Sequence, residues 1–378
     1  MSRILVVAGA ASGVGKTTLT IGLLEAYRRR GLVVQAFKVG PDFIDPGFHA
    51  LVTGRPSYTL DGWMCGREHA LATVGRYAAD ADLAIVEGVM GCFDGADATG
   101  DAGSTAEIAK WLGAPVVLVI DASAQSRSAA AVVQGFERFD GDLRVAAVVA
   151  NRVGSAGHGG WMAEAIERGI DLDRLLELAA PLVVPRPAAE RQAAPRARIG
   201  VARDVAFQFY YPDSLARLHA AGASLVEFSP LTDGCLPDVD GLYLGGGYPE
   251  LHTAALGRNA PMRAAIADFA ASGRPVYAEC GGLMYLAQAI EDAEGVTHSM
   301  AGVLPTTVRM RPGRLALGYA EVRFTWTPRS GRRARSRGAT SSTPRRWIRS
   351  RRTCGGPTRR SGARGPRAAR ATSSAARS

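Results

Sequence analysis

Several features that mark secreted or membrane proteins are scarce in this sequence. Its 378 residues hold only five cysteines, at positions 65, 92, 235, 280 and 354, and no two have C-x-x-C spacing. This pattern indicates reduced thiols and argues against a disulfide framework or a zinc site. No apolar run approaches the roughly 18 residues that a membrane helix needs. We therefore predict a cytoplasmic protein without membrane contact, long enough for two domains with full cores.

Lysine and acidic residues are absent from the C-terminal segment. Residues 326–378 contain 16 arginines, and subtracting these charges from the net charge of +10 leaves −6 for residues 1–325. The basicity belongs to this tail, so no nucleic-acid partner is expected for the rest of the chain. The tail also lacks the aliphatic residues of a core, which predicts disorder.

The rest of the chain is organised around residues 3–18, which read R-I-L-V-V-A-G-A-A-S-G-V-G-K-T-T. The apolar run at 4–8 predicts a buried strand, and Lys16 opens an amphipathic helix that runs to about residue 30. A strand, a glycine loop and Gly-Lys-Thr predict a phosphate-binding loop, where glycines let backbone N–H groups approach a phosphate. Lys16 would reach the outer phosphates of ATP, and the Thr17 hydroxyl would ligate Mg²⁺. The predicted nucleotide-binding residues here are Gly13, Gly15, Lys16, Thr17 and Thr18.

The loop is longer than the common form, because five residues separate Gly9 from Gly15. That spacing resembles the dethiobiotin-synthetase group of ATP-using ligases.

Acidic side chains and a lysine follow the next predicted strand, residues 32–39. The segment G-P-D-F-I-D-P-G-F-H (40–49) has two prolines, which predicts a rigid loop without helix. Lys38, Asp42 and Asp45 would lie at the sheet edge where open α/β proteins bind ligands. A single loop aspartate usually forms a turn or a cap. Beside a phosphate loop, we favour a role in holding Mg²⁺ and a reacting carboxylate.

Glu87 ends a third predicted strand, 82–86, where it is placed like the second Mg²⁺-binding acid of phosphate-loop enzymes. Asp94 follows in a glycine-rich loop, and Ser104 or Thr105 would cap the next helix. Buried strands at 114–121 and 143–153 continue the alternation of strand and helix. This order predicts a doubly wound parallel sheet.

A stretch rich in Pro, Ala and Arg, 184–198, reads as a linker. We predict an ATP-binding domain over 1–183, a second α/β domain over 199–325 and the tail over 326–378. The aromatic segment 206–213 either faces a flat macrocycle or packs in a core.

Two motifs of the second domain carry its chemistry. The stretch D-G-L-Y-L-G-G-G-Y-P-E (240–250) predicts a strand that ends in glycines, and the bare amides of Gly246 and Gly247 can stabilise an oxyanion. The stretch R-P-V-Y-A-E-C-G-G-L-M-Y-L (274–286) predicts a strand, a sharp turn at Cys280 and a helix after two glycines. This nucleophile elbow would place the thiol near a helix N-terminus that lowers its pKa. A lone cysteine is usually a small buried hydrophobe, but the Glu-Cys-Gly-Gly context favours a nucleophile.

Together these motifs resemble the cobyrinic and hydrogenobyrinic acid a,c-diamide synthase family. The resemblance runs through about residue 325, and its second part is similar to class I glutamine amidotransferase domains. It is carried by four stretches: F-K-V-G-P-D-F-I-D-P-G-F-H, G-R-P-S-Y-T-L-D-G-W-M, V-E-G-V-M-G-C-F-D-G and G-S-T-A-E-I-A-K-W-L-G-A-P-V.

The resemblance implies amidation of the a and c side-chain carboxylates of a corrin acid, with ATP, Mg²⁺ and glutamine. Cys280 would release ammonia from glutamine through a thioester, and ammonia would attack an acyl phosphate made with ATP. ATP and Mg²⁺ would be held by Lys16, Thr17, Asp42 and Glu87, and Asn151 would contact the adenine. The acyl phosphate and the substrate would be held or polarised by Lys38, Asp45 and Asp94.

The family pattern also calls for a histidine beside the thiol, from a late strand. The histidines are at 49, 69, 158, 219, 252 and 298, and the last 80 residues contain none. We interpret residues 326–378 as the product of a shifted reading frame, since residues 338–343 can be written in codons that encode His-Glu-Phe-His in another frame. A genuine basic tail that binds polyanions is the alternative.

Two other functions stay open. A sister amidase that acts on another tetrapyrrole, such as nickel-sirohydrochlorin, would share this catalytic core. A nucleotide-switched binding ATPase, with the tail on nucleic acid, would need neither the elbow at Cys280 nor the glycine strand. The ring metal, the order of amidation and a homodimer are left open.

Overall fold

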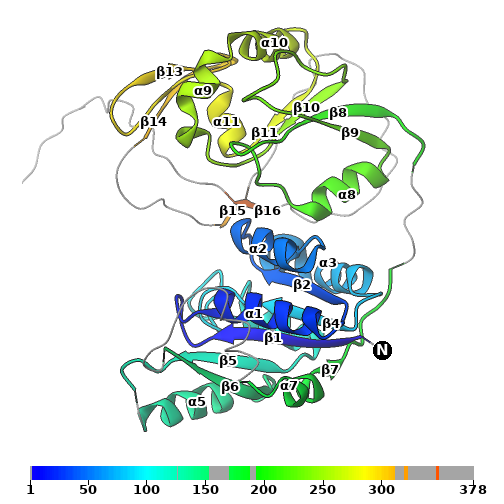
Figure 1. The fold of residues 1–378 in the computed structure, drawn as a ribbon, viewed down its shortest axis with the longest axis vertical. Coiled ribbons are helices and arrows are strands. Elements are labelled where there is room, and N and C mark those ends of the chain that lie inside the picture. The colour runs from blue at the N-terminus through cyan, green and yellow to red at the C-terminus, as the bar shows by residue number, and fades with distance from the viewer. Residues whose placement is uncertain are drawn as a thin grey trace, which may run out of the picture.

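The computed structural model describes residues 2–125, 127–152, 170–187, 193–310, 319–321 and 346–348. Two α/β bodies lie one above the other in Figure 1. The first begins with strand β1 (Arg3–Gly9) and ends with β7 (Ala180–Pro181), and the second begins with β8 (Ala197–Ala202). The predicted fold class, a phosphate-loop sheet followed by a second α/β unit, is confirmed.

The first body is built on a parallel sheet with the strand order β3-β2-β4-β1-β5-β6, to which β7 adds antiparallel beside β1. Its other elements are α1 (Lys16–Arg29), β2 (Val34–Val39), α2 (Ile44–Thr53), β3 (Tyr58–Leu60), α3 (Gly62–Tyr77), β4 (Leu83–Glu87), α4 (Thr105–Leu112), β5 (Val116–Asp121), α5 (Ser128–Phe139), β6 (Val145–Asn151) and α7 (Leu172–Leu178).

The central strands bury both of their faces. In β1, Ile4 and Val6 pack into one apolar cluster, whereas Leu5 and Val7 pack into the other. Successive side chains of a strand point to opposite faces, and a sheet covered by helices on both sides reads as a continuous apolar run. The carboxyl ends of β1, β2 and β4 therefore meet at one rigid edge, where the predicted site residues lie.

The structure corrects two predictions for this body. Residues 40–49 are not a helix-free loop, because α2 begins at Ile44 and includes Pro46 in its first turn. Proline is tolerated there, since the first N–H groups of a helix have no intrahelical partner. Strand β6 is not fully buried, because it ends the strand order and leaves Val148 41% exposed. The predicted helix after the phosphate loop is confirmed, as is Ser104 as the cap of α4.

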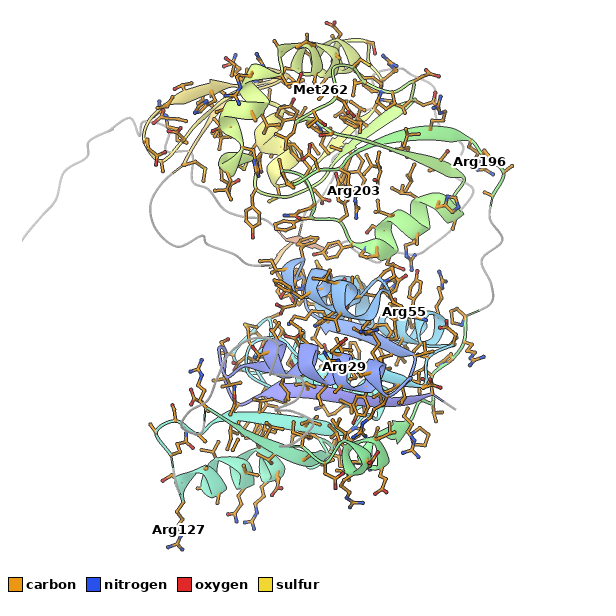
Figure 2. All side chains as sticks on the ribbon, in the orientation of Figure 1. Arg29, Arg55, Arg127, Arg196, Arg203 and Met262 are labelled. Atoms are coloured by element: carbon orange, nitrogen blue, oxygen red, sulfur yellow. The ribbon has the colours of Figure 1, made fainter. Side chains whose placement is uncertain are left out.

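The second body contains a parallel sheet of order β11-β10-β8-β9 and a smaller sheet of order β13-β12-β14. Met262 is fully buried in its core, whereas Arg127 of the first body extends away from the molecule (Figure 2). Its elements after β8 are α8 (Pro212–Ala220), β9 (Ala223–Phe228), β10 (Gly241–Leu244), the 3₁₀ turn η2 (Pro249–Leu251), α9 (Thr253–Arg258), α10 (Ala260–Ala271), β11 (Val276–Ala278), α11 (Gly281–Tyr285), β12 (Ala287–Glu291), β13 (Thr297–Ser299) and β14 (Leu304–Arg309).

Beyond β14 the structure describes two short paired strands, β15 (Tyr319–Glu321) and β16 (Arg346–Ile348). The predictions of a disordered tail and of a shifted reading frame otherwise concern residues outside the described ranges. The four described cysteines form no disulfide. No helix within the described ranges is long and apolar enough to cross a membrane.

Candidate functional site

The predicted phosphate-binding loop joins β1 to α1. Gly13 and Gly15 both have positive φ angles, of 76° and 97°, which glycine adopts without a steric penalty. A Cβ atom at Gly15 would clash with the side-chain amide of Asn151. The loop therefore passes close to Asn151, and a side chain at Gly15 would not fit there.

Lys16, the first residue of α1, is buried and directs its ammonium group across the loop. Its Nζ donates to the carbonyl oxygens of Met90, at 2.5 Å, and Ala11, at 3.3 Å. Burial, followed by repulsion from Lys38, lowers the pKa of Lys16. Met90 itself has a φ of 45°, a strained conformation of the kind found at functional sites. Thr18, in contrast, lies exposed on the first turn of α1.

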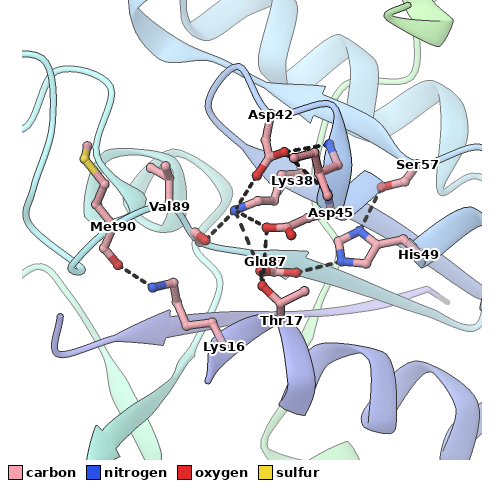
Figure 3. A network of polar contacts seen from close by, with 12 residues as sticks. Lys16, Thr17, Lys38, Asp42, Asp45, His49, Ser57, Glu87, Val89 and Met90 are labelled. Atoms are coloured by element: carbon pink, nitrogen blue, oxygen red, sulfur yellow. Dashed lines mark hydrogen bonds and ion pairs between the residues drawn. The ribbon is translucent and has the colours of Figure 1, made fainter. Parts of the chain in front are cut away.

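Five side chains from four elements meet at the start of α1, and we call them the phosphate-loop cluster (Figure 3). The Thr17 hydroxyl donates to Glu87 Oε1 at 2.6 Å and lies 3.3 Å from Asp45 Oδ2. The members of the cluster are Thr17, Lys38, Asp45, His49 and Glu87. All of them except His49 were predicted to manage ATP, Mg²⁺ or the substrate, and the order of the strands brings them together.

Lys38 is the cation of the cluster and is almost fully buried. Its Nζ donates to the Gly88 carbonyl at 2.8 Å and lies 3.3 Å from Asp45 and 3.7 Å from Glu87. A buried ammonium group is stable only when it is paired. Lys38 thus neutralises two carboxylates while its own charge stays beside the phosphate loop.

His49 belongs to the cluster, although no role was predicted for it. Its Nε2 donates to Glu87 Oε2 at 2.7 Å, and its Nδ1 lies 3.1 Å from Ser57 Oγ. Burial acts to raise the pKa of Glu87, but the hydrogen bond from His49 and the charge of Lys38 outweigh it, so this pKa lies below its ordinary value. The sequence does contain one signal for His49, because this histidine follows closely after Asp42 and Asp45 in the same motif.

Asp42 binds the start of α2, whereas the Thr17 hydroxyl contacts Asp45 and Glu87. Its Oδ1 accepts from the backbone N–H groups of Ile44, at 2.8 Å, and Asp45, at 3.3 Å, so it caps the start of α2. Its carboxylate is 3.8 Å from Lys38 Nζ, and burial together with the nearby charge of Asp45 raises its pKa. Asp42 therefore has the capping role that is common for a loop aspartate. Asp45 is the acid that lies beside Thr17 and Glu87.

The two remaining predicted residues of this domain, Asp94 and Asn151, lie around the loop and hydrogen-bond to backbone groups there. Asp94 Oδ2 accepts from the Gly91 backbone N–H at 2.9 Å, within its own loop after β4. Asn151 donates from Nδ2 to the Val14 carbonyl at 2.7 Å, and Arg152 donates to the Gly13 carbonyl at 2.7 Å. The end of β6 thus fastens the phosphate loop. The predicted adenine contact of Asn151 stays a prediction.

The oxygen atoms of the cluster fit a magnesium ion. Within the described ranges no three His, Cys, Asp or Glu side chains are arranged to hold a metal by themselves. Magnesium rarely needs such a cage, since it is usually held by one or two carboxylates together with substrate phosphates and water. The hydroxyl of Thr17 and the carboxylates of Asp45 and Glu87 are hard oxygen donors of this kind, at the N-terminus of α1.

The second predicted site is a turn between β11 and α11, and we call residues 279–282 the cysteine elbow. Cys280 has φ 49° and ψ −113°, the strained turn that pushes a nucleophile out of a strand end. Helix α11 begins at Gly281, directly after the cysteine and not after both glycines as predicted. A side chain at Gly282 would collide with Leu244 of β10, so close packing explains the glycine pair.

Backbone amides surround the thiol, as the glycine motif predicts, although with a different pair. The N–H groups of Gly281 and Gly247 hydrogen-bond toward Cys280 and act to lower its pKa. The N–H of Gly246 instead donates to the Phe209 carbonyl at 3.3 Å. Of the two predicted oxyanion donors, Gly247 is therefore the one directed at the nucleophile.

The predicted activation of the thiol is wrong for the described residues. Partial desolvation raises the pKa of Cys280, and the carboxylates of Glu250 and Glu279 add to this effect. The backbone hydrogen bonds from Gly281 and Gly247 do not outweigh this burial. The late histidine His298 hydrogen-bonds Asp292 at 2.8 Å.

Aromatic and polar side chains join the two bodies between these sites. Phe43, next to Asp42, stacks with Phe209 at 5.3 Å and with Tyr211 at 4.2 Å between ring centroids. Tyr319 donates its hydroxyl to Asp61 at 3.0 Å. Of the two readings of the aromatic segment 206–213, the core reading is confirmed for Phe207 and Tyr210, which are buried in cores, and the contact with a macrocycle stays a prediction.

Comparisons with known proteins agree with this geometry. Residues 5–192 match the family model of a CobQ/CobB/MinD/ParA nucleotide binding domain, and residues 198–338 match a CobB/CobQ-like glutamine amidotransferase domain. The cobyrinate a,c-diamide synthase of Syntrophotalea carbinolica is 48% identical over 371 residues, which cover 84% of this chain and 81% of that protein. The cobyrinate a,c-diamide synthase of Archaeoglobus fulgidus is 41% identical, over 84% of this chain and 80% of that protein.

Among solved structures, the cobyrinic acid a,c-diamide synthase of Mycobacterium smegmatis with bound ADP and magnesium is similar over 49% of this chain and 86% of that chain. Its sequence identity of 16% and TM-score of 0.24 are too low to support a conclusion about the present molecule.

Proposed function

The chain belongs to the cobyrinate a,c-diamide synthase family, and from this premise we propose that it amidates the a and c side-chain carboxylates of cobyrinic or hydrogenobyrinic acid. It is then a cytoplasmic carbon–nitrogen ligase that uses ATP and takes its nitrogen from glutamine. The observation that carries the proposal is the presence of a phosphate-loop cluster and a cysteine elbow in one chain. A nucleotide switch would use the first of these sites and leave the second without a purpose.

ATP binding falls to the phosphate loop. The backbone N–H groups of Gly13 and Gly15 and the ammonium group of Lys16 would hold its phosphates, and Asn151 would contact its adenine. Thr17 and Glu87 would hold Mg²⁺, and the geometry supports Asp45 in preference to Asp42 as the third oxygen ligand. Mg²⁺ supplies charge neutralisation, which is the main catalytic term in phosphoryl transfer.

The substrate carboxylate would approach Lys38 and Asp94 at the same sheet edge. One of its oxygens attacks the γ-phosphorus of ATP, ADP leaves, and an acyl phosphate forms. Ammonia then attacks the acyl carbon, inorganic phosphate leaves, and the amide remains. Lys38 is suited to holding the negative charge of both steps, because it is fixed by the Gly88 carbonyl and paired with Asp45.

Ammonia comes from glutamine at the cysteine elbow. The Cys280 thiolate attacks the side-chain amide carbon, ammonia leaves, and water later hydrolyses the thioester to glutamate. The backbone N–H groups of Gly247 and Gly281 lie where they can stabilise the oxyanion of both steps. We expect this half of the reaction to be slow in the 378-residue chain, because burial raises the pKa of Cys280 and the thiolate is the reactive form.

Mass spectrometry of amide products tests the proposal most directly. The purified chain is given ATP, Mg²⁺ and ammonium salt with cobyrinic acid, hydrogenobyrinic acid or nickel-sirohydrochlorin in parallel. We expect two added amides on a corrin acid. Amidation of nickel-sirohydrochlorin alone would assign the chain to the sister activity, and ATP turnover without any amide would contradict the ligase. Sizing of the same preparation tests the homodimer.

A further inference from the structure

The imidazole of His49 is buried completely between two polar partners. Both His49 and Glu87 have no solvent exposure, and Ser57, on the far side of the ring, is also buried. The three groups form a continuous line, from Ser57 Oγ to Nδ1 at 3.1 Å and from Nε2 to Glu87 Oε2 at 2.7 Å (Figure 3). Such a line costs desolvation, so the fold keeps it only where each group is satisfied.

The direction of these bonds follows from the chemistry of the groups. A carboxylate is only an acceptor, so the His49 Nε2–H must donate to Glu87. Ser57 fixes the other side of the ring, because its hydroxyl bonds Nδ1. The imidazole is therefore locked both in position and in the tautomer that presents a donor to Glu87.

The two oxygen atoms of Glu87 have different partners. Oε2 faces His49, whereas Oε1 faces Thr17 at 2.6 Å and Lys38 at 3.7 Å. With Oε2 held, the carboxylate cannot rotate, and Oε1 stays directed at the hydroxyl that begins the phosphate-binding helix. Ligating carboxylates are themselves usually held by such outer hydrogen bonds.

We propose that His49, supported by Ser57, is a positioning residue that orients the Glu87 carboxylate to bind Mg²⁺ with the nucleotide. The inference rests on the proposed function only in that Mg²⁺ and a nucleotide bind at this loop. His49 touches neither of them and acts through Glu87. His49 is one of two buried residues of α2, and the buried Ser57 comes directly before β3, so the line consists of groups closed off from solvent.

The test is calorimetric titration of Mg²⁺ into the ADP-bound protein, without a tetrapyrrole. We expect His49→Leu to weaken Mg²⁺ binding by about 10–100-fold, the usual effect of losing an outer-shell partner. His49→Gln, which keeps an N–H near the Nε2 position, should stay close to the parent protein, and Ser57→Ala should fall between them. ADP binding measured in EDTA should be the same in all variants.

The matched control is His298→Leu, which removes a histidine bonded to Asp292 at the same short range in the second body and should leave Mg²⁺ binding unchanged. Superimposable Mg²⁺ titrations of His49→Leu and the parent would overturn the inference, as would a parallel loss of ADP binding in EDTA. If His49→Leu does not fold, an unchanged Mg²⁺ affinity in folded Ser57→Ala overturns it. A chain that amidates no tetrapyrrole, yet loses Mg²⁺ in His49→Leu, contradicts the proposed function alone.

Discussion

The phosphate-loop cluster and the cysteine elbow solve the problem of a buried reactive group in different ways. In the cluster, buried charges compensate one another: Lys38 lies within 4 Å of Asp45 and Glu87, and His49 holds the far oxygen of Glu87. At the elbow, the backbone places Cys280, but the charged neighbours that affect its thiol are the acids Glu250 and Glu279.

The difference shows that positioning and activation are separate tasks. A strained φ angle and two glycines are enough to expose a nucleophile, because they act on geometry alone. Forming a thiolate requires a positive partner or a base, and burial without one favours the neutral thiol. The first body therefore has its chemistry assembled, while the second has only its geometry. The following changes test that contrast, from the largest expected effect to the smallest.

Replacing Lys16 with alanine should stop amidation with ammonia and with glutamine alike, because both routes need the acyl phosphate. Loss of one charge partner in a transition state typically costs about 2.7–4 kcal/mol, or about 10²–10³ in rate. Amide formation is followed by mass spectrometry with each nitrogen donor. If Lys16→Ala still amidated its substrate with ammonia, the assignment of the phosphate loop as the ATP site would be contradicted.

Replacing Glu87 with glutamine should raise the Mg²⁺ concentration required for half-maximal activity by on the order of tenfold or more, since an oxygen ligand loses its charge. The isosteric change should leave the fold intact, which circular dichroism checks. An unchanged Mg²⁺ requirement would make Glu87 an ordinary acid at a strand end.

Alkylation of Cys280 by iodoacetamide should require a higher pH than alkylation of free cysteine. The thiolate is the reactive form, and a raised pKa means that less of it is present at any pH below that value. The rate is measured by peptide mass spectrometry between pH 6 and 10, with the exposed Cys235 as an internal reference. If alkylation of Cys280 reached half of its maximal rate at a lower pH than alkylation of free cysteine, the elbow would be shown to activate its thiol.

The smallest effect is expected at the contact between the bodies. Tyr319→Phe removes the hydroxyl that donates to Asp61 at 3.0 Å, and a hydrogen bond of this kind contributes about 0.5–1.5 kcal/mol. The midpoint temperature of thermal unfolding should fall by a correspondingly small amount, and ammonia-dependent amidation should be retained. A loss of activity without a change in unfolding would mean that Tyr319 takes part in the chemistry.

Local sequence patterns were sufficient for the parts of the molecule that depend on neighbours in the chain. The Gly-Lys-Thr loop, Glu87 at a strand end and the turn at Cys280 are encoded within a few residues of each site, and the structure places them as predicted. The bond between His49 and Glu87 could not be found in this way. It joins residues 38 apart: His49 lies on α2, which follows β2, and Glu87 ends β4, the neighbour of β2 in the sheet.

Two errors have a similar origin. The prolines of 40–49 were read as helix breakers, although Pro46 falls in the first turn of α2, where only its exact position makes it harmless. The pKa of Cys280 was expected to fall because a helix follows it. The pKa rises first because the thiol is partly desolvated and then because of Glu250, which η2 brings near the elbow. Both outcomes are set by boundaries and packing.

The most direct test of the contrast compares two rates in the same preparation of the 378-residue chain. Glutamate released from glutamine reports on the cysteine elbow, and amide formed from ammonium salt and a corrin acid reports on the phosphate-loop cluster. We predict measurable ammonia-dependent amidation together with almost no glutamine hydrolysis. Robust glutamine hydrolysis that disappears in Cys280→Ala would contradict the account.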